Sequence, residues 1–259
     1  MRALADMIWV EMRKAVCSRL PLFTAAGSLF LPLGIALLIF IAQNPESSRK
    51  LGLVGAKANL LAYAAMDWPA YLVLTAQMIA AGGFFLFCLI ISWVFGREFV
   101  DGTLKDLLAV PVPRASILLA KFVVTGAWSA VVAAVILIAS LLMGALLGLP
   151  QGLPGVLLQG SALVAVTSCL VILVVMPFAF FASAGRGYLL PLGMAVLVLI
   201  AANLVAILGW GAYFPWAVPG FYAQNQGDLA LASYLIAVLT AVAGMFATYL
   251  WWQRADQSR

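Results

Sequence analysis

The sequence predicts an all-α integral membrane protein with six transmembrane helices. Of its 259 residues, 66% are hydrophobic and only 9% are charged, whereas soluble domains carry about 25% charged residues. Runs without a charge recur along the chain, and each is long enough for at least one crossing of a bilayer, which takes about 20 residues. Short stretches between these runs hold most of the charges. We therefore expect one transmembrane domain over residues 1–259.

Residues 1–19 are expected to form a separate amphipathic helix that lies in the inner membrane interface. A helical wheel places most apolar side chains on one arc, with Arg2, Asp6 and Arg13 opposite. The alternative is a plain cytoplasmic start to the first span. The uncharged run after Arg19 is too long for the core of a cleaved signal peptide, so we expect it to be the first span. The apolar arc holds Leu4, Ala5, Ile8, Trp9, Met12, Ala15 and Val16.

The uncharged runs locate the six spans. The longest run, residues 122–185, is long enough for two spans, and a turn-rich stretch at 149–155 with two prolines and two glycines divides it. The predicted spans are Pro21–Ala42, Tyr71–Phe95, Ile117–Leu147, Val156–Phe181, Tyr188–Trp210 and Leu229–Gln253.

The stretch after the fifth span, residues 211–228, is too apolar and aromatic for a free aqueous loop, yet Pro and Gly interrupt it. Irregular backbone at membrane depth is tolerated only where protein covers it. We expect a re-entrant element of short helices that dips into the outer leaflet. The alternative is a simple loop with a belt of aromatic side chains at the interface.

The distribution of Lys and Arg predicts the orientation. With six spans, eleven of the 14 cations fall on the side of the two termini, and only Arg49, Lys50 and Lys57 fall on the other side. Short cytoplasmic segments are enriched in Lys and Arg. We therefore expect a multi-pass protein of the bacterial inner membrane with both termini in the cytoplasm.

The segment between the second and third spans, residues 96–121, carries an unusual density of charge. It holds seven of the chain's 23 charged residues in 26 positions, and uncharged runs flank it. We expect it to lie in the cytoplasm, with residues 96–116 as the loop proper. Its charged residues are Arg97, Glu98, Asp101, Lys105, Asp106, Arg114 and Lys121.

The centre of this segment predicts a helix of about two turns, Thr103–Ala109. Asp101 is a suitable capping residue, and Pro111 cannot continue the helix. Three leucines share one face of it, which fits a groove on a partner protein. The alternative, which composition alone favours, is that these leucines pack back onto the bundle. They are Leu104, Leu107 and Leu108.

Several kinds of chemistry are not predicted. Histidine is absent, there is no GxxxxGK[ST] phosphate-binding loop, and the interiors of the predicted spans carry no ionisable residue for proton or ion coupling. We therefore expect no enzyme activity, no metal and no cofactor on this chain. The scattered cations do not indicate nucleic-acid binding. The residues proposed for a substrate path are Gln77, Phe84, Phe85 and Asn203.

One resemblance adds to this interpretation. Glu98, the run Gly102-Thr103-Leu104-Lys105, then Leu107-Leu108, Pro111, Arg114 and Lys121 are similar to the signature that ABC-2 type transporter permeases carry between their second and third spans. The N-terminal helix, the six spans and the broken element before the last span agree with that family over the whole chain. The chain most resembles the small permeases of bacitracin-resistance and lantibiotic-immunity exporters.

The resemblance implies roles for most of these residues. The Thr103–Ala109 helix would be a coupling helix seated in a cytoplasmic ATPase subunit, which would bind ATP and magnesium. The three leucines would anchor it, and Glu98, Lys105 and Arg114 would set its register through charge pairs. Gly102 would permit the turn and Pro111 would end the helix. A second permease subunit, identical or different, would complete an exporter of amphipathic or hydrophobic substrates such as peptide antibiotics, drugs or lipids.

Three other functions stay open at this point. A secondary transporter would need ionisable residues within its spans. A membrane-embedded transferase would need a cluster of acids and bases at the membrane face. An immunity or structural protein could sequester a peptide without transport and without an ATPase.

Overall fold

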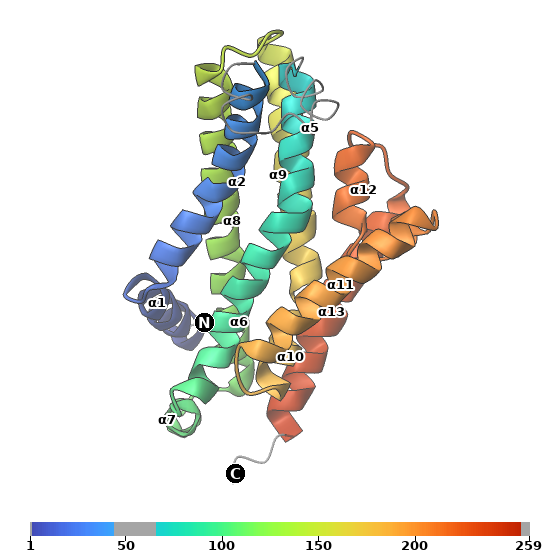
Figure 1. The fold of residues 1–259 in the computed structure, drawn as a ribbon. Helices are drawn as coiled ribbons and strands as arrows, with labels where there is room; N and C mark the ends of the chain where they lie inside the picture. Colours follow the sequence, from blue (N-terminus) through green and yellow to red (C-terminus); the bar gives the residue numbers. More distant parts are fainter. Residues whose placement is uncertain (1, 44–65, 255–259) are drawn as a thin grey trace.

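The computed structural model describes residues 2–43 and 66–254, and these residues form helices and loops with no β-strand. Six helices are long and apolar enough to cross a membrane. Each overlaps one predicted span, so the predicted all-α membrane protein with six spans is confirmed. In Figure 1 these helices form an elongated bundle. They cover Leu20–Gln43, Trp68–Val100, Arg114–Leu146, Pro154–Ala184, Leu189–Ile207 and Leu231–Arg254.

Four of the six spans are single helices: α2 (Leu20–Gln43), α8 (Arg114–Leu146), α11 (Leu189–Ile207) and α13 (Leu231–Arg254). The second span is a continuous run in which one π-helical turn interrupts the α-helix. The fourth span breaks at Pro177, since proline has no N–H to donate. The composite spans consist of α5 (Trp68–Met78), η2 (Ile79–Gly83) and α6 (Phe84–Val100), and of α9 (Pro154–Val175) and α10 (Phe178–Ala184).

The predicted boundary between the third and fourth spans is confirmed. Helix α8 ends at Leu146 and α9 begins at Pro154, a residue that suits the first turn of a helix because its missing N–H needs no partner there. The start of α5 is fixed similarly: the side chain of Asp67 accepts a hydrogen bond of 3.0 Å from the Ala70 N–H, and Pro69 lies in the first turn.

The N-terminal helix α1 (Arg2–Val16) is separate from α2, as predicted, and packs against α8. The side that it buries overlaps the predicted apolar arc only in part, since Ala15 belongs to that arc but Met7 and Glu11 do not. Met7, Glu11 and Ala15 are buried, whereas Trp9 is 61% exposed. An acidic side chain therefore lies at the centre of the buried face. A position of α1 in the membrane interface remains a prediction.

The segment after α11 is broken into two short helices, as predicted. The 3-10 turn η3 (Gly211–Tyr213) leads to α12 (Val218–Gln224), which packs on α5 and α9. The indole N–H of Trp216 donates a 2.8 Å hydrogen bond to the Val174 carbonyl, just before the break at Pro177. The protein thus covers this irregular segment on one side, and its depth in a membrane remains a prediction.

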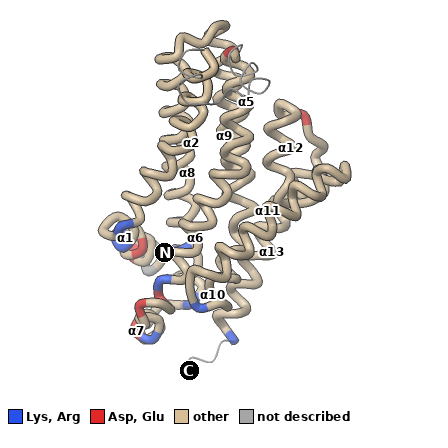
Figure 2. The backbone as a smooth tube through the Cα atoms, viewed as in Figure 1, with Lys and Arg blue, Asp and Glu red and all other residues tan. Residues whose placement is uncertain are grey.

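Most of the described charged residues gather at one end of the bundle, where α1, the short helix α7 (Leu104–Ala109) and the end of α13 lie (Figure 2). We call this the charged end. The predicted outer cations Arg49, Lys50 and Lys57 lie outside the described residues. At the charged end two helices extend beyond their predicted spans: α6 continues past Phe95 to Val100, and α8 begins at Arg114 rather than Ile117.

This length corrects one prediction. Glu98 lies within the helical run Trp68–Val100 and Lys121 lies within Arg114–Leu146, so two span helices carry an ionisable residue near one end. Both side chains are buried, Glu98 at 3% and Lys121 at 0% exposure. The sequence placed both in the charge-dense segment 96–121, which was expected to lie in water, although the predicted third span Ile117–Leu147 already included Lys121.

Candidate functional site

The charged end presents α7 on a tight turn after α6. Asp101 ends α6, Gly102 adopts a left-handed φ of +70°, and α7 runs from Leu104 to Ala109 before Val110 becomes extended. No atom lies within 4 Å of where a Cβ of residue 102 would be, so the backbone conformation rather than space favours glycine. The predicted roles of Gly102 in the turn and of Pro111 beyond the end of the helix agree with this geometry.

Asp101 does not cap α7 as predicted. Its carboxylate accepts a hydrogen bond of 3.0 Å from the Nε of Arg97, one turn earlier in α6. Thr103 occupies the capping position of α7, but its hydroxyl donates to Glu98 instead, at 2.6 Å. The start of α7 is therefore held by a link to α6 rather than by a local cap.

The predicted leucine face also needs correction. Leu107 is 9% exposed and belongs to the hydrophobic core, and the half-buried Leu104 packs against that core. The side chain of Leu108 lies outside the described part of the chain. These contacts favour the alternative in which the leucines pack back onto the bundle. The surface that α7 leaves exposed carries Lys105 and Asp106, with Val110 and Pro111 after it.

Beneath α7, two acids and two lysines from three helices form a buried network of ion pairs. Lys121 of α8 donates to Glu11 of α1 at 2.9 Å and to Glu98 of α6 at 3.2 Å. Lys14 of α1 donates to the same two acids, at 3.0 Å to Glu11 and 2.9 Å to Glu98. Each charge thus has two partners of opposite sign. We call Glu11, Lys14, Glu98 and Lys121 the charge network.

The network is fully supplied with hydrogen bonds. Lys121 also donates to the Val94 carbonyl at 3.0 Å, and the second oxygen of Glu98 accepts from Thr103. Burial by itself lowers the pKa of Lys14, but Glu11 and Glu98 outweigh this effect and the pKa is raised. Lys14 therefore stays charged at neutral pH, and the network ties the start of α7 to α1 and α8.

Glu98 was predicted to form a charge pair with a partner protein, and this assignment is corrected. Its carboxylate is buried and is bound by Lys14, Lys121 and Thr103. Arg114 is likewise engaged within the chain, because its guanidinium donates to the carbonyls of Trp252 and Gln253 at 2.9 and 3.4 Å. A cation is favourable at this position because the last carbonyls of α13 have no helical partner.

Sequence reasoning gave no role to Glu11, Lys14 or Lys121, although Lys121 is part of the family signature. One signal could have identified Glu11: it lies four residues after Met7 and four before Ala15, so an acid stands in a stripe of small and apolar side chains. Lys121 had been counted among the charges of the aqueous segment. Its place in the second turn of a long helix shows that it faces protein instead.

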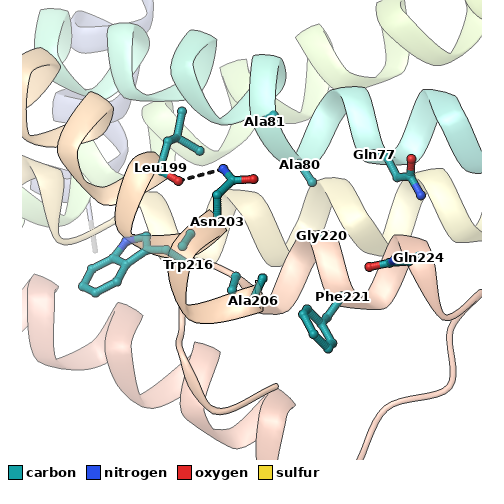
Figure 3. Close-up of a pocket in the computed structure, with 12 residues that line it drawn as sticks. Gln77, Ala80, Ala81, Leu199, Asn203, Ala206, Trp216, Gly220, Phe221 and Gln224 are labelled. Carbon is teal, nitrogen blue, oxygen red and sulfur yellow. Dashed lines mark hydrogen bonds between the residues drawn. The ribbon is translucent and has the colours of Figure 1, made fainter. Parts of the chain in front are cut away.

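A second candidate site is a pocket of about 290 Å³ farther along the bundle, between the π-helical turn, α11 and α12. Its walls are small residues, mainly Ala and Gly, with three carboxamides among them. In Figure 3, Gln77 and Gln224 lie at one end of the pocket and Trp216 at the other. The amide nitrogen of Asn203 donates to the Leu199 carbonyl at 2.8 Å, and its oxygen points away from that bond.

The structure brings together two of the four residues predicted for a substrate path, Gln77 and Asn203. Phe84 does not line this pocket. Its side chain is 1% exposed, and its ring packs edge-on against that of Phe178, with the two ring centres 5.5 Å apart. Phe84 is therefore a core residue. Phe85 is 39% exposed on α6 and also lies outside the pocket lining.

The π-helical turn η2 was not predicted from the sequence. Its residues Ile79–Gly83 include two alanines and two glycines, and Ala80 and Ala81 line the pocket. A π-helical turn inside an α-helix changes the phase of the side chains that follow and is frequent at functional sites. Here it opens a wall of small side chains opposite Asn203.

In the described residues, no three His, Cys, Asp or Glu side chains are grouped so that they could hold a metal ion. The pocket is lined by uncharged groups that can donate and accept hydrogen bonds and by aromatic rings. Such a lining suits the reversible binding of a neutral polar or amphipathic group.

Comparison with known proteins places the chain in a family. A family model described as ABC-2 family transporter protein matches residues 7–203, which run from the middle of α1 through α7 into α11. Over 178 residues the chain is 26% identical to the bacitracin transport permease protein BCRB of Bacillus licheniformis, an alignment that covers 66% of this chain and 84% of that protein. The chain therefore belongs to the ABC-2 transporter family and is a multi-pass membrane transport permease.

Proposed function

We propose that this permease is the transmembrane subunit of an ATP-driven exporter and that a separate ATPase subunit binds at α7. The sequence has no phosphate-binding loop of its own, so ATP and magnesium would be bound by that partner. In this proposal the charged end lies in the cytoplasm of a bacterium with both termini, in line with the excess of Lys and Arg there. Two permease subunits and two ATPases would make up the transporter.

The observation that carries the proposal is the charge network beneath α7. Glu98 and Thr103 bind α7 at its start, while Lys121 and Glu11 join the same network from α8 and α1. A force applied to α7 by a closing ATPase would therefore act on the N-terminal helix α1 and on the span α8 at once. A coupling helix needs such a rigid base, because motion in a flexible loop would not reach the spans.

The proposed contact surface of α7 differs from the predicted one. Lys105, Asp106, Val110 and Pro111 are exposed and would meet the ATPase. Leu104 and Leu107 would support the helix from within. A mixed surface of charges and small apolar groups is typical of the rim and centre of a protein interface.

The pocket at Gln77, Asn203 and Gln224 is proposed as part of the substrate path. Its three carboxamides can pair with the amides of a peptide, and Trp216 and Phe221 can contact apolar side chains. About 290 Å³ accommodates only part of a peptide antibiotic, so a larger substrate would extend beyond the pocket. The similar permease is named for bacitracin transport, which supports an amphipathic peptide as the substrate class.

The test is co-purification of the permease with a candidate ATPase subunit from the same organism. Exchanging the charges of α7 with Lys105→Glu and Asp106→Lys keeps the net charge and changes only exposed groups. We expect this variant to fold normally but to lose most of the bound ATPase and of the ATP-dependent transport. Arg254→Gln, which changes an exposed cation of α13 near the same end, is the matched control and should bind as the wild type. Normal ATPase binding by the exchanged variant would refute α7 as the docking site.

The other candidate functions are separated by a second measurement. In vesicles, substrate uptake that requires ATP and the ATPase supports the exporter. Uptake driven by a proton gradient without the ATPase would indicate a secondary transporter. Protection of cells against a peptide without any flux would indicate an immunity protein.

A further inference from the structure

A second pocket lies at the charged end, where α1 meets α6 and the chain turns into α2, and it shares only Lys14 with the charge network. Its volume is about 470 Å³. Three of its seven lining residues are cations and none is acidic. The lining consists of Trp9, Val10, Arg13, Lys14, Cys17, Ser18 and Arg97.

The three cations are not equally neutralised. Lys14 pairs with the two acids of the charge network, and Arg97 pairs with Asp101. Arg13 is exposed, and its guanidinium lies over the ring of Trp9, 5.2 Å from the ring centre. Among the described residues no acid pairs with Arg13, so the pocket keeps a positive charge on its open side.

The cations are held in place by aromatic and backbone contacts. The guanidinium of Arg97 lies 4.9 Å from the ring centre of Trp93, and its NH1 group donates to the Lys14 carbonyl at 3.4 Å. Cation–π contacts of this kind leave the edge of a guanidinium available to an oxygen ligand. The Nε and NH1 groups of Arg97 are already bound by Asp101 and the Lys14 carbonyl, so Arg13 is the main cation of the site and Arg97 adds to the positive charge beside it.

Exposed apolar side chains follow the pocket residues in the chain, at the end of α1 and the start of α2. Val16 is 54% exposed, and Leu22 and Phe23 in the first turn of α2 are 69% and 60% exposed. Trp9, at 61% exposure, borders the pocket itself. An anion site that joins an apolar strip fits a ligand with a charged head and an apolar tail. A free anion would contact only the anion site and not the apolar strip.

We propose that this pocket binds the phosphate headgroup of an anionic phospholipid, with Arg13 contacting the phosphate and the acyl chains lying along Leu22 and Phe23. Trp side chains are favoured at headgroup level, and basic residues near a membrane surface attract anionic lipids. The bound lipid would brace α1 against α6, next to the charge network. The binding itself is independent of the proposed ATPase contact, so the two can fail separately.

Native mass spectrometry of the full-length chain in detergent tests the proposal. The probes are phosphatidylglycerol and phosphatidylcholine with identical acyl chains. We expect clear preference for phosphatidylglycerol and a loss of about fivefold in its affinity in Arg13→Gln, the effect of one cation near a lipid surface. Arg13→Lys should retain the preference, and Arg254→Gln is the control at a distant exposed cation. Because Arg13 is exposed and free of ion pairs, the loss should occur without a change in melting temperature.

Three outcomes would overturn the proposal. These are equal binding of the two lipids, unchanged phosphatidylglycerol binding in Arg13→Gln, or full displacement of the lipid by millimolar inorganic phosphate. The last outcome would identify a site for a free phosphate group instead of a lipid. Lipid binding that persists in the Lys105→Glu, Asp106→Lys variant would show that the site does not depend on ATPase docking.

Discussion

Removal of Lys121 should be among the most damaging single changes in this chain. Its ammonium group is fully buried and contacts Glu11 at 2.9 Å and Glu98 at 3.2 Å. In Lys121→Met the two acids would share Lys14 alone, and the network would keep one uncompensated buried negative charge. Breaking a buried ion pair by removing one partner costs about 3–5 kcal/mol of unfolding free energy. Met fills a similar volume, so packing contributes little to the loss.

A second substitution should restore part of this stability. Glu11→Gln in the Lys121→Met background leaves one acid and one lysine, Glu98 and Lys14, which are 2.9 Å apart. The double variant should therefore be more stable than Lys121→Met alone, with a coupling energy of about 0.5–3 kcal/mol for residues in one network. If the two losses simply add, the network is not the source of the stability.

Thermal unfolding can be followed through Cys88, which is fully buried in α6. In a Cys17→Ser, Cys169→Ser background, a thiol-reactive dye labels Cys88 only when the bundle opens. Heating the purified protein in detergent then gives an unfolding temperature for each variant. If Lys121→Met unfolds at the same temperature as the parent protein, the charge network does not stabilise the fold.

Three further results are expected. Gly244→Ala would place a Cβ 2.4 Å from the Cα of Pro177 and should destabilise the protein by about 1–3 kcal/mol, whereas Gly193→Ala, with no atom within 4 Å, should not lower the unfolding temperature. Asn203→Leu should reduce substrate transport in vesicles while ATPase binding stays normal, and a parallel loss of both would place the residue in the fold rather than the substrate path. Because the pKa of Lys14 is raised by folding, its charged form stabilises the folded state fully at a pH below the ordinary pKa of 10.5. This contribution is lost as the pH rises through the raised pKa. The unfolding temperatures of wild type and Lys14→Met should therefore converge only in strongly alkaline buffer.

Helix α7 was predicted correctly in its length but not in the direction of its leucines. The length of this helix was close to the prediction, since Gly102 and Pro111 limit it locally. Composition alone favoured packing of its leucines onto the bundle, and the family resemblance shifted the prediction to a partner protein, because a two-turn helix with one apolar face can make either contact. The structure places Leu107 in the core and leaves Lys105 and Asp106 outside.

The pocket at Gln77 and Asn203 was also predicted only in part. Gln77 and Asn203 were selected because uncharged polar residues are rare in the spans, and the structure places both in one lining. Gln224 and Trp216 were missed as partners because they come from the irregular segment between α11 and α13. Phe84 could not be told from a pocket residue by its type alone, and packing against Phe178 decided its role.

The sequence by itself determined that this chain is a six-span α-helical membrane protein, with breaks at the turn-rich stretch before Pro154 and at the charged segment. These features follow from local composition, since a run of about 20 apolar residues crosses a bilayer and charges with Gly and Pro interrupt it. The tertiary structure alone decided which charges are buried. Glu11 and Lys121 are 110 residues apart in the chain, and each is tolerated in the interior only because folding brings the other within 2.9 Å.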